Sequence, residues 1–253
     1  MARLGRRFPI SRVADPVSFP PVAFDSVGAG SSADVFGVVG NASTSWPHNI
    51  GSNANTLLVF SHYVSNSIAL VATVGGTNYN ALASNYVYNG GNAFVYGASI
   101  FLVRNPPKSA QTIIISNTTG GGTQYIAGNS IAYSGVGSFD IGFPLNTAPQ
   151  TNAGYFSQAL SGDPTLTIPN TRNGQRIVNW LGYSGNQSSV GFSGYTAANT
   201  RFTYLDPGNK YLPFIIGDSP GGGPITFSAA ITALAYEWWN SGIILNPATP
   251  FRQ

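Results

Sequence analysis

The chain has 253 residues, which is enough to bury a core as one large β-sandwich or as two domains. It has no cysteine, which excludes disulfides, cysteine metal ligands and thiol nucleophiles. Charged residues make up only 8% of the chain, against roughly 25% in ordinary soluble domains, while aromatic residues make up 13%. Disordered chains are poor in aromatic residues, so this composition indicates a folded protein with a polar but nearly uncharged surface.

The net charge of +3 arises at the start of the chain. Arg3, Arg6, Arg7 and Arg12 are four of the 11 basic residues, and the other basic residues are outnumbered by eight acidic ones. The rest of the chain is therefore nearly neutral. Binding to nucleic acid requires clustered lysine and arginine on the folded body, so we expect no nucleic-acid partner. The basic start lacks the apolar stretch of a signal peptide, and no apolar run reaches the roughly 18 residues of a membrane span. We therefore expect no membrane insertion.

Residues 1–35 are predicted to form an extended docking arm. They show neither helical nor strand periodicity, and their arginine-rich start is followed by several prolines and phenylalanines. A disordered tail is the ordinary alternative for such a terminus. We expect the arm to lie on a neighbouring subunit or on the body of its own chain. The residues expected to dock are Arg3, Arg6, Arg7, Phe8, Arg12 and Phe19.

The strongest strand signals lie in the middle of the chain. Residues 94–103 form a run of β-branched and aromatic residues, and residues 111–116 form a second apolar run. Pro106 and Pro107 between them cannot donate to a ladder, so the chain must turn there. This pattern predicts two strands that meet at a tight connection and pair as an antiparallel unit.

The other elements are predicted around this pair. Residues 41–55 and 144–161 are predicted loops, and residues 225–239 are interpreted as one long strand although their alanines would suit a helix. No repeat of constant period is found. In chain order, the predicted strands are 35–39, 56–64, 68–74, 78–82, 94–103, 111–116, 124–133, 138–143, 166–168, 176–183, 188–193, 201–205, 211–216 and 225–239.

Strands at this spacing, separated by glycine and proline, predict an all-β fold. The expected architecture is an antiparallel, jelly-roll-like β-sandwich with an extended N-terminal arm. The expected divisions are the arm at 1–35, the β-sandwich at 36–240 and a surface C-terminal tail at 241–253.

Residues that could bind a metal or a cofactor are sparse. His48 and His62 are the only histidines, and the eight acidic residues are scattered singly, so no metal site is predicted. Residues 28–33 match a loose dinucleotide fingerprint, but no helical pattern follows them, as that motif requires. We therefore expect no cofactor.

Residues that could carry catalysis are equally sparse. Residues 182–185 and 191–194 come near a Gly-x-Ser-x-Gly nucleophile elbow, but the second glycine comes one position early. Glycoside hydrolysis would need two facing carboxylates. Asp163, Asp206 and Asp218 are each followed closely by proline and are interpreted as turn residues.

The four tryptophans allow two interpretations. Together with 13 tyrosines they could stack on sugar rings of a glycan. Such residues more often lie in a core or at a subunit interface. The residues considered for a glycan or subunit contact are Trp46, Trp180, Trp238 and Trp239.

Several stretches resemble a jelly-roll module of phage and actinobacterial proteins. Residues 55–60 (Asn-Thr-Leu-Leu-Val-Phe) resemble its opening G-x-L-L-V strand, and residues 75–79 (Gly-Gly-Thr-Asn-Tyr) resemble its x-G-x-x-Y turn. Residues 98–115 are similar to its two strands around a proline turn. The most specific match is Ile-Ala-Tyr-Ser-Gly-Val at 131–136, which resembles v-x-e-Y-S-G-v, with Ala132 in place of the glutamate. Phe139-Asp140 then stands at the p-x-d of that pattern.

The resemblance covers about residues 50–240, and residues 3–9 (Arg-Leu-Gly-Arg-Arg-Phe-Pro) are similar to the starts of minor tail proteins from phages of actinobacteria. It implies a non-enzymatic virion structural protein, made in the host cytoplasm and located in the tail or tail tip rather than the capsid. Its implied partners are other virion proteins and copies of itself. A capsid decoration protein, a carbohydrate-binding module for host cell-envelope glycans and a glycosidase are the alternatives.

Overall fold

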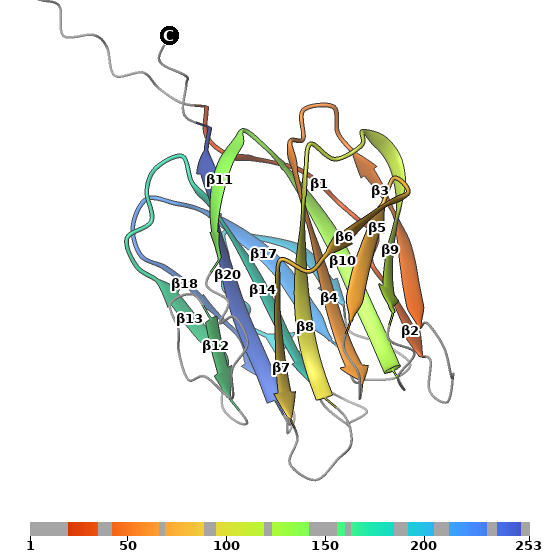
Figure 1. Ribbon diagram of the computed structural model, residues 1–253. Helices are drawn as coiled ribbons and strands as arrows, with labels where there is room; N and C mark the ends of the chain where they lie inside the picture. Colours follow the sequence, from red (N-terminus) through yellow and green to blue (C-terminus); the bar gives the residue numbers. More distant parts are fainter. Residues whose placement is uncertain are drawn as a thin grey trace, which may run out of the picture.

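The computed structural model describes residues 20–34, 42–65, 69–88, 95–118, 123–141, 156–159, 163–184, 192–204, 213–231 and 237–248. Every regular element in these ranges is a β-strand, and every strand pair is antiparallel. The sheets are stacked on one another as layers (Figure 1). The prediction of an all-β, antiparallel sandwich is confirmed.

The first half of the chain forms two facing sheets. Sheet A has the strand order β1-β10-β4-β8-β7, with β2 also paired to β10, and sheet B has the order β3-β9-β5-β6. The chain crosses repeatedly between the two sheets in the manner of a jelly roll, with the β5-β6 pair in sheet B and β7 as an additional edge strand of sheet A. The strands are β1 (Ala23–Val27), β2 (Ser31–Asp34), β3 (Ser43–Ile50), β4 (Thr56–Ser65), β5 (Leu70–Val74), β6 (Thr77–Asn80), β7 (Ala83–Tyr88), β8 (Val95–Arg104), β9 (Ser109–Asn117) and β10 (Thr123–Ser134).

The second half repeats this topology. Sheet C has the order β11-β20-β14-β17-β16, with β12 also paired to β20, and two small sheets pair β13 with β18 and β15 with β19. Each of its strands has a counterpart in the first half, and only β6 lacks one in the described ranges. The strands are β11 (Val136–Ile141), β12 (Phe156–Ala159), β13 (Thr165–Ile168), β14 (Arg176–Ser184), β15 (Phe192–Ser193), β16 (Asn199–Tyr204), β17 (Phe214–Pro220), β18 (Ile225–Ser228), β19 (Ala230–Ile231) and β20 (Glu237–Pro247).

The strand registers support this duplication. Thr56 of β4 lies opposite Arg104 and Tyr133, and Arg176 of β14 lies opposite Pro220 and Leu245. When the halves are aligned on these positions, the residues that face the centre of the molecule coincide. The chain is therefore built from two topologically equivalent halves, a repeat that sequence inspection missed because few residue identities accompany it.

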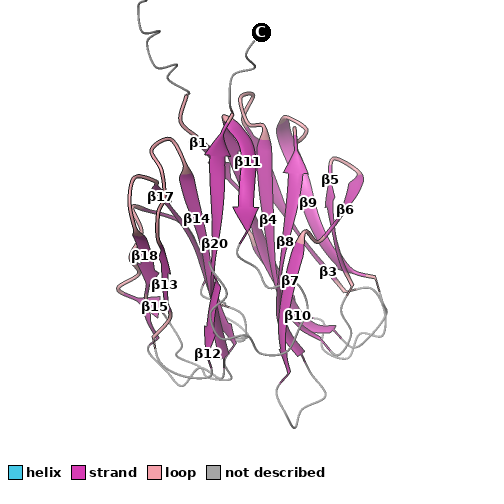
Figure 2. Cartoon of the chain, turned by 60° about the vertical axis from the view of Figure 1, so that its left-hand side comes forward, coloured by secondary structure: helices cyan, strands magenta, loops and turns pink. Residues whose placement is uncertain are grey.

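The two halves pack through sheets A and C, which form the middle of the molecule (Figure 2). One buried cluster joins them, with Phe60, Ile100 and Ile131 from sheet A packed against residues of sheet C such as Trp180 and Ile216. A second cluster fills the space between sheets A and B, and a third lies between sheet C and the β13-β18 pair.

The middle position of sheet A explains the continuous apolar run in β4. Leu58 and Phe60 belong to the cluster shared with sheet C, whereas Leu57 and Val59 belong to the cluster shared with sheet B. All four side chains are fully buried, because both faces of the sheet are covered. A strand buried on both faces reads as a continuous apolar run rather than as an alternation.

The predicted central hairpin is wrong. β8 pairs with β4 and β7 in sheet A, whereas β9 pairs with β3 and β5 in sheet B. The connection through Pro106 and Pro107 therefore carries the chain from one sheet to the other. It begins at Asn105, whose positive φ of 47° bends the backbone out of sheet A.

Several other predicted boundaries are also corrected. Residues 43–50, predicted as loop, form β3 with strictly alternating burial, a strand made inconspicuous by its polar residues. Residues 241–247, predicted as a surface tail, belong to β20, where Ile243 and Leu245 are fully buried. The long strand predicted at 225–239 is interrupted after Ser228, where Ala229 separates β18 from β19.

Part of the segment predicted as an extended arm consists of strands. Residues 23–27 and 31–34 form β1 and β2, which pair with β10 of the same chain. This part of the arm therefore lies on the body of its own chain and belongs to sheet A. Residues 1–19 and 35–41 lie outside the described ranges.

Candidate functional site

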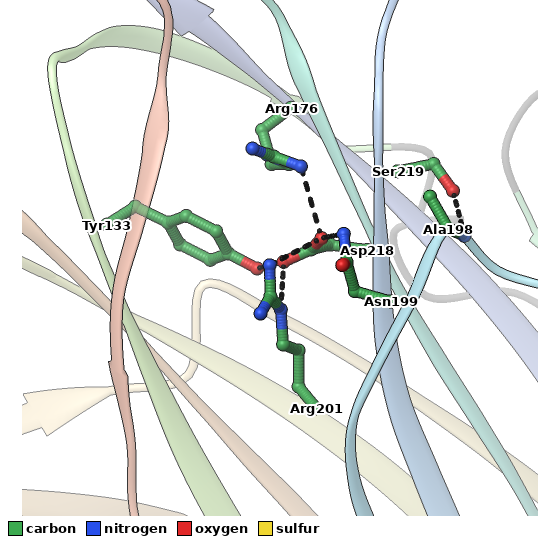
Figure 3. A network of polar contacts seen from close by, with 7 residues as sticks. All are labelled: Tyr133, Arg176, Ala198, Asn199, Arg201, Asp218 and Ser219. Atoms are coloured by element: carbon green, nitrogen blue, oxygen red, sulfur yellow. Dashed lines mark hydrogen bonds and ion pairs between the residues drawn. The ribbon is translucent and has the colours of Figure 1, made fainter.

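The most concentrated charge in the described chain is a buried network around Asp218 (Figure 3). Asp218 lies in β17, and its carboxylate is fully buried between sheets A and C. Arg201 of β16 donates from Nε to Oδ2 at 2.8 Å and from Nη2 to Oδ1 at 3.2 Å. Arg176 of β14 donates from Nη1 to Oδ1 at 3.3 Å, and Asn199 donates to the same oxygen at 2.9 Å.

The network also joins the two halves of the chain. Tyr133 of β10 donates its hydroxyl hydrogen to Asp218 Oδ2 at 2.9 Å, across the interface between sheets A and C. The Arg201 guanidinium carbon lies 3.9 Å from the centre of the Phe24 ring, a cation–π contact with β1. The network therefore ties β1 and β10 of the first half to β14, β16 and β17 of the second.

Asp218 is compensated by an unusually complete set of donors. A carboxylate can accept hydrogen bonds at about four lone-pair sites. Here the donors to these sites are two arginines, a tyrosine and an asparagine. Burial, together with the charge of Asp218 and its hydrogen bond, raises the pKa of Tyr133 well above its usual value. Tyr133 therefore acts as a permanent donor rather than as an acid or base at neutral pH.

The equivalent position in the first half is apolar. Asp218 lies opposite Val178 in β14, and the corresponding residue in β8 is Leu102, opposite Leu58 in β4. Leu102 packs against the central hydrophobic cluster. The fold therefore does not require a carboxylate at this place, and the charge network is specific to the second half.

The sequence interpretation of Asp218 as a turn residue is wrong. Phe214, Ile216 and Asp218 alternate along β17, so their side chains share the face that packs on sheet A. This spacing of two residues was the signal available in the sequence. The proline at position 220 concealed it, because Pro220 ends the strand two residues later.

A second polar network holds β1, β3 and β10 together. His48 Nδ1 lies 2.7 Å from Ser130 Oγ, and His48 Nε2 lies 3.0 Å from Ser26 Oγ. Trp46 Nε1 donates to Ser130 Oγ at 2.9 Å, and Ser26 donates to Asp25 Oδ2 at 2.7 Å. The chain of hydrogen bonds thus runs from a buried indole to a carboxylate.

The order of donors assigns the protons in this network. Ser130 accepts from the indole and donates to His48 Nδ1, and the proton on Nε2 of a neutral imidazole then goes to Ser26. Burial lowers the pKa of His48 to about 4, an effect that the charge of Asp25 opposes only in part. The imidazole is therefore neutral at physiological pH.

The serine, histidine and aspartate of this network are the residue types of a hydrolase triad, but their placement is structural. Ser130 is fully buried, and His48 is 1% exposed. A nucleophile must reach its substrate, and Ser130 instead lies against Trp46 in the space between sheets A and B. His62 is also fully buried, and burial lowers its pKa well below the usual value.

A third network connects sheet C to the β13-β18 pair. Tyr195 donates to Asn179 Oδ1 at 2.7 Å, and Asn179 Nδ2 donates to Asn240 Oδ1 at 2.5 Å. Asn240 Nδ2 in turn donates to the Phe227 carbonyl at 3.3 Å. Each interface between layers in the described chain therefore contains a polar network within its apolar packing.

The structure places only some of the residues predicted for contacts. Trp46 and Trp180 are each 1% exposed and lie in the cores, so their assignment to a glycan or subunit contact is wrong. Trp238 and Trp239 fall in β20, but their side chains lie outside the described part. Outside the described ranges altogether lie Arg3, Arg6, Arg7, Phe8, Arg12 and Phe19.

Neither a metal-binding cluster nor a membrane-spanning helix is found among the described residues. They contain no group of three or more histidine, cysteine, aspartate or glutamate residues able to hold a metal ion. No helix long and apolar enough to cross a membrane occurs in this part of the chain. A scan against protein-family profiles found no match, and searches of curated proteins and of solved structures found none either.

Proposed function

We propose that this protein is a non-enzymatic structural component of a phage virion, in the tail or tail tip. The resemblance of residues 3–9 and 50–240 to minor tail proteins and their jelly-roll module supports the virion setting. In this role the segment 1–19 docks the protein on the particle, and the β-sandwich assembles with neighbouring subunits.

One structural observation carries the structural role. Within the described part of the chain, Ser130, His48 and Asp218 are buried and take part in hydrogen bonds that join neighbouring sheets. The hydrogen bonds and ion pairs of these side chains help to hold the layers of the sandwich in place relative to one another. Such a scaffold suits a subunit that must keep its shape within an assembly.

The structure also sharpens the experiment that tests docking. Residues 20–34 include β1 and β2, so a deletion of residues 1–35 would remove two strands of sheet A together with any arm. A deletion of residues 1–19 leaves every described strand in place. The full-length chain and the 1–19 deletion should therefore be compared in phage particles purified from cells that express each protein.

We expect full-length protein in the purified particles at a few copies each, measured by quantitative mass spectrometry, and located at the tail by labelled antibody in electron microscopy. We expect the deletion to fold, shown by an unchanged circular dichroism spectrum, but to be absent from particles. A full-length protein that never co-purifies with particles would overturn the virion role. Hundreds of copies on the capsid would identify a decoration protein instead.

A further inference from the structure

The connection between β13 and β14 carries an exposed asparagine that is followed directly by a glycine. Residues 172–175 form a tight turn, in which Gln175 N donates to the Arg172 carbonyl at 3.2 Å and Arg172 N donates to Gln175 Oε1 at 2.6 Å. Asn173 and Gly174 are the two central residues of this turn. Asn173 is exposed, and its side-chain amide makes no hydrogen bond to another described residue. The turn is therefore held by its two outer residues, and the Asn173 amide is free to move.

The backbone of this turn also requires the glycine. Gly174 has a φ of 85°, in the left-handed region that residues with a Cβ rarely adopt. Because a glycine has no side chain to shield its backbone nitrogen, the side chain of the preceding residue can approach that nitrogen. The fold thus keeps Asn173 beside the neighbour that leaves it most open to attack. Asn170, which is exposed in the same connection, is followed instead by the β-branched Thr171.

We propose that Asn173 is a site of spontaneous deamidation in the folded protein. The backbone nitrogen of Gly174 loses its proton to hydroxide and attacks Cγ of Asn173. A bond forms between this nitrogen and Cγ, the bond between Cγ and Nδ2 breaks, and ammonia leaves with a proton taken from water. The product is a five-membered succinimide ring, and no atom is oxidised or reduced.

One water molecule then opens the ring at one of its two carbonyl carbons. Attack at Cγ breaks the new bond and gives aspartate at position 173. Attack at the backbone carbonyl carbon breaks the original peptide bond and gives isoaspartate, in which the main chain runs through the former side chain. In either case the net reaction consumes one water and releases one ammonia, and it lowers the net charge of the chain by one.

The position of the turn gives this reaction a structural consequence. Val22 N donates to the Gly174 carbonyl at 2.9 Å, so the residue before β1 is tied to the turn. A Cβ on Gly174 would lie 3.6 Å from Cγ of Pro247, the last residue of β20. The turn therefore lies at the end of the molecule where β1 begins and β20 ends (Figure 1). Isoaspartate lengthens the main chain by one carbon just before Gly174, which displaces the carbonyl that holds Val22.

The charge of the product also falls in a packed place. Asn173 Oδ1 lies close to the glycine loop 221–223 that follows β17, since a Cβ on Gly222 would come within 2.8 Å of this oxygen. Deamidation therefore converts a neutral amide at the contact between two connections into a carboxylate. Ion-exchange chromatography separates the product from the unmodified chain because of this added charge.

Incubation of the purified full-length chain at neutral and at mildly alkaline pH tests the proposal. Chymotryptic cleavage after Leu166 and Trp180 yields a peptide with three asparagines, which are Asn170, Asn173 and Asn179. Tandem mass spectrometry locates the converted residue, and electron-transfer fragmentation distinguishes isoaspartate from aspartate. We expect conversion at Asn173 to be at least about tenfold faster than at Asn170, and faster at the higher pH because hydroxide removes the amide proton. A sample digested without incubation corrects for conversion during digestion.

Asn173→Ser is the matched control, because serine keeps the turn polar but carries no amide that can close the ring. Hydrogen exchange should show less protection at the Val22 amide in the isoaspartate form, whereas incubated Asn173→Ser should keep the protection of fresh protein. Conversion at Asn173 no faster than at Asn170, or conversion found only after unfolding in urea, would overturn the proposal. Unchanged protection of Val22 in the isoaspartate form would overturn the displacement inferred for its anchor. The reaction needs no partner and no enzyme, so its outcome is independent of the virion role.

Discussion

Replacement of Asp218 by asparagine should destabilise the protein strongly, because it removes the only negative charge in a network that holds two arginines. Arg176 and Arg201 have side chains that are only 17% and 19% exposed, so water cannot fully replace the lost carboxylate. Removing one partner from a buried ion pair costs about 3–5 kcal/mol. The partial exposure of both arginines places the expected loss at the lower end, about 3 kcal/mol.

Urea denaturation followed by tryptophan fluorescence measures this loss. A loss of about 3 kcal/mol is easily resolved, because the total stability of a protein is about 5–15 kcal/mol. Asp140→Asn is the matched control. Asp140 is exposed and accepts one hydrogen bond from Asn246, and surface changes of this kind stay within about 0.5 kcal/mol. A loss below about 1 kcal/mol for Asp218→Asn would refute the reasoning, because the arginines would then have been solvated all along.

A second variant separates charge compensation from packing. The first half carries Leu102 at the equivalent position, so the network can be replaced by an apolar set, Asp218→Leu with Arg176→Met and Arg201→Met. Apolar replacement of a complete buried ion network is often neutral or stabilising. We expect the triple variant to recover part of the stability lost in Asp218→Asn, because the charges are gone but the buried Tyr133 hydroxyl still lacks an acceptor. A triple variant as unstable as the single one would show that the hydrogen bond from Tyr133 matters more than the charges.

Three further predictions concern the other networks and the chain terminus. The pKa of His48 is about 4 in the folded protein and about 6.5 in the unfolded chain, so only the unfolded state gains a proton as the pH falls between these values. The free energy of unfolding should therefore fall by about 3 kcal/mol more for wild type than for His48→Gln between pH 7 and pH 4. Equal losses in urea titrations of the two proteins would contradict this. Tyr195→Phe leaves Asn179 Oδ1 without its donor and should cost about 1–3 kcal/mol by thermal or urea unfolding, whereas a change below 0.5 kcal/mol would mean that Asn179 finds another partner. Deletion of residues 1–19 should leave the melting temperature within about 2 °C of wild type, whereas deletion of residues 1–34 should yield insoluble or unfolded protein; equal stability of the two would show that β1 and β2 are dispensable.

The strand content could be predicted from the sequence because apolar, β-branched residues indicate strands wherever they are dense. β4, β8 and β14 were recognised in this way. β3 was missed because its exposed positions are serine, proline and asparagine, and its buried positions include Thr44 and His48. Such a strand is defined by the alternation of burial rather than by the residue types themselves.

The candidate site was hidden from the sequence for a related reason. Asp218, Arg176, Arg201 and Tyr133 are separated by up to 85 residues, and nothing local marks them as partners. The networks form because sheets A and C face each other in one register. At Asp218 the position within an apolar strand outweighed the proline that follows.

By itself, the sequence determined that this is an all-β chain of many short strands, because the apolar runs and the glycine and proline punctuation act locally. Only the tertiary structure decided which strands pair. After Pro106 and Pro107 the chain could either fold back on β8 or cross to sheet B, because the prolines end the hydrogen-bonding of β8 in both arrangements. Which arrangement forms depends on which sheet buries Ile113 and Ile115, and this is sheet B packed on sheet A. The duplication of the fold and the burial of Trp46 and Trp180 are likewise properties of packing between distant segments, which local sequence does not encode in readable form.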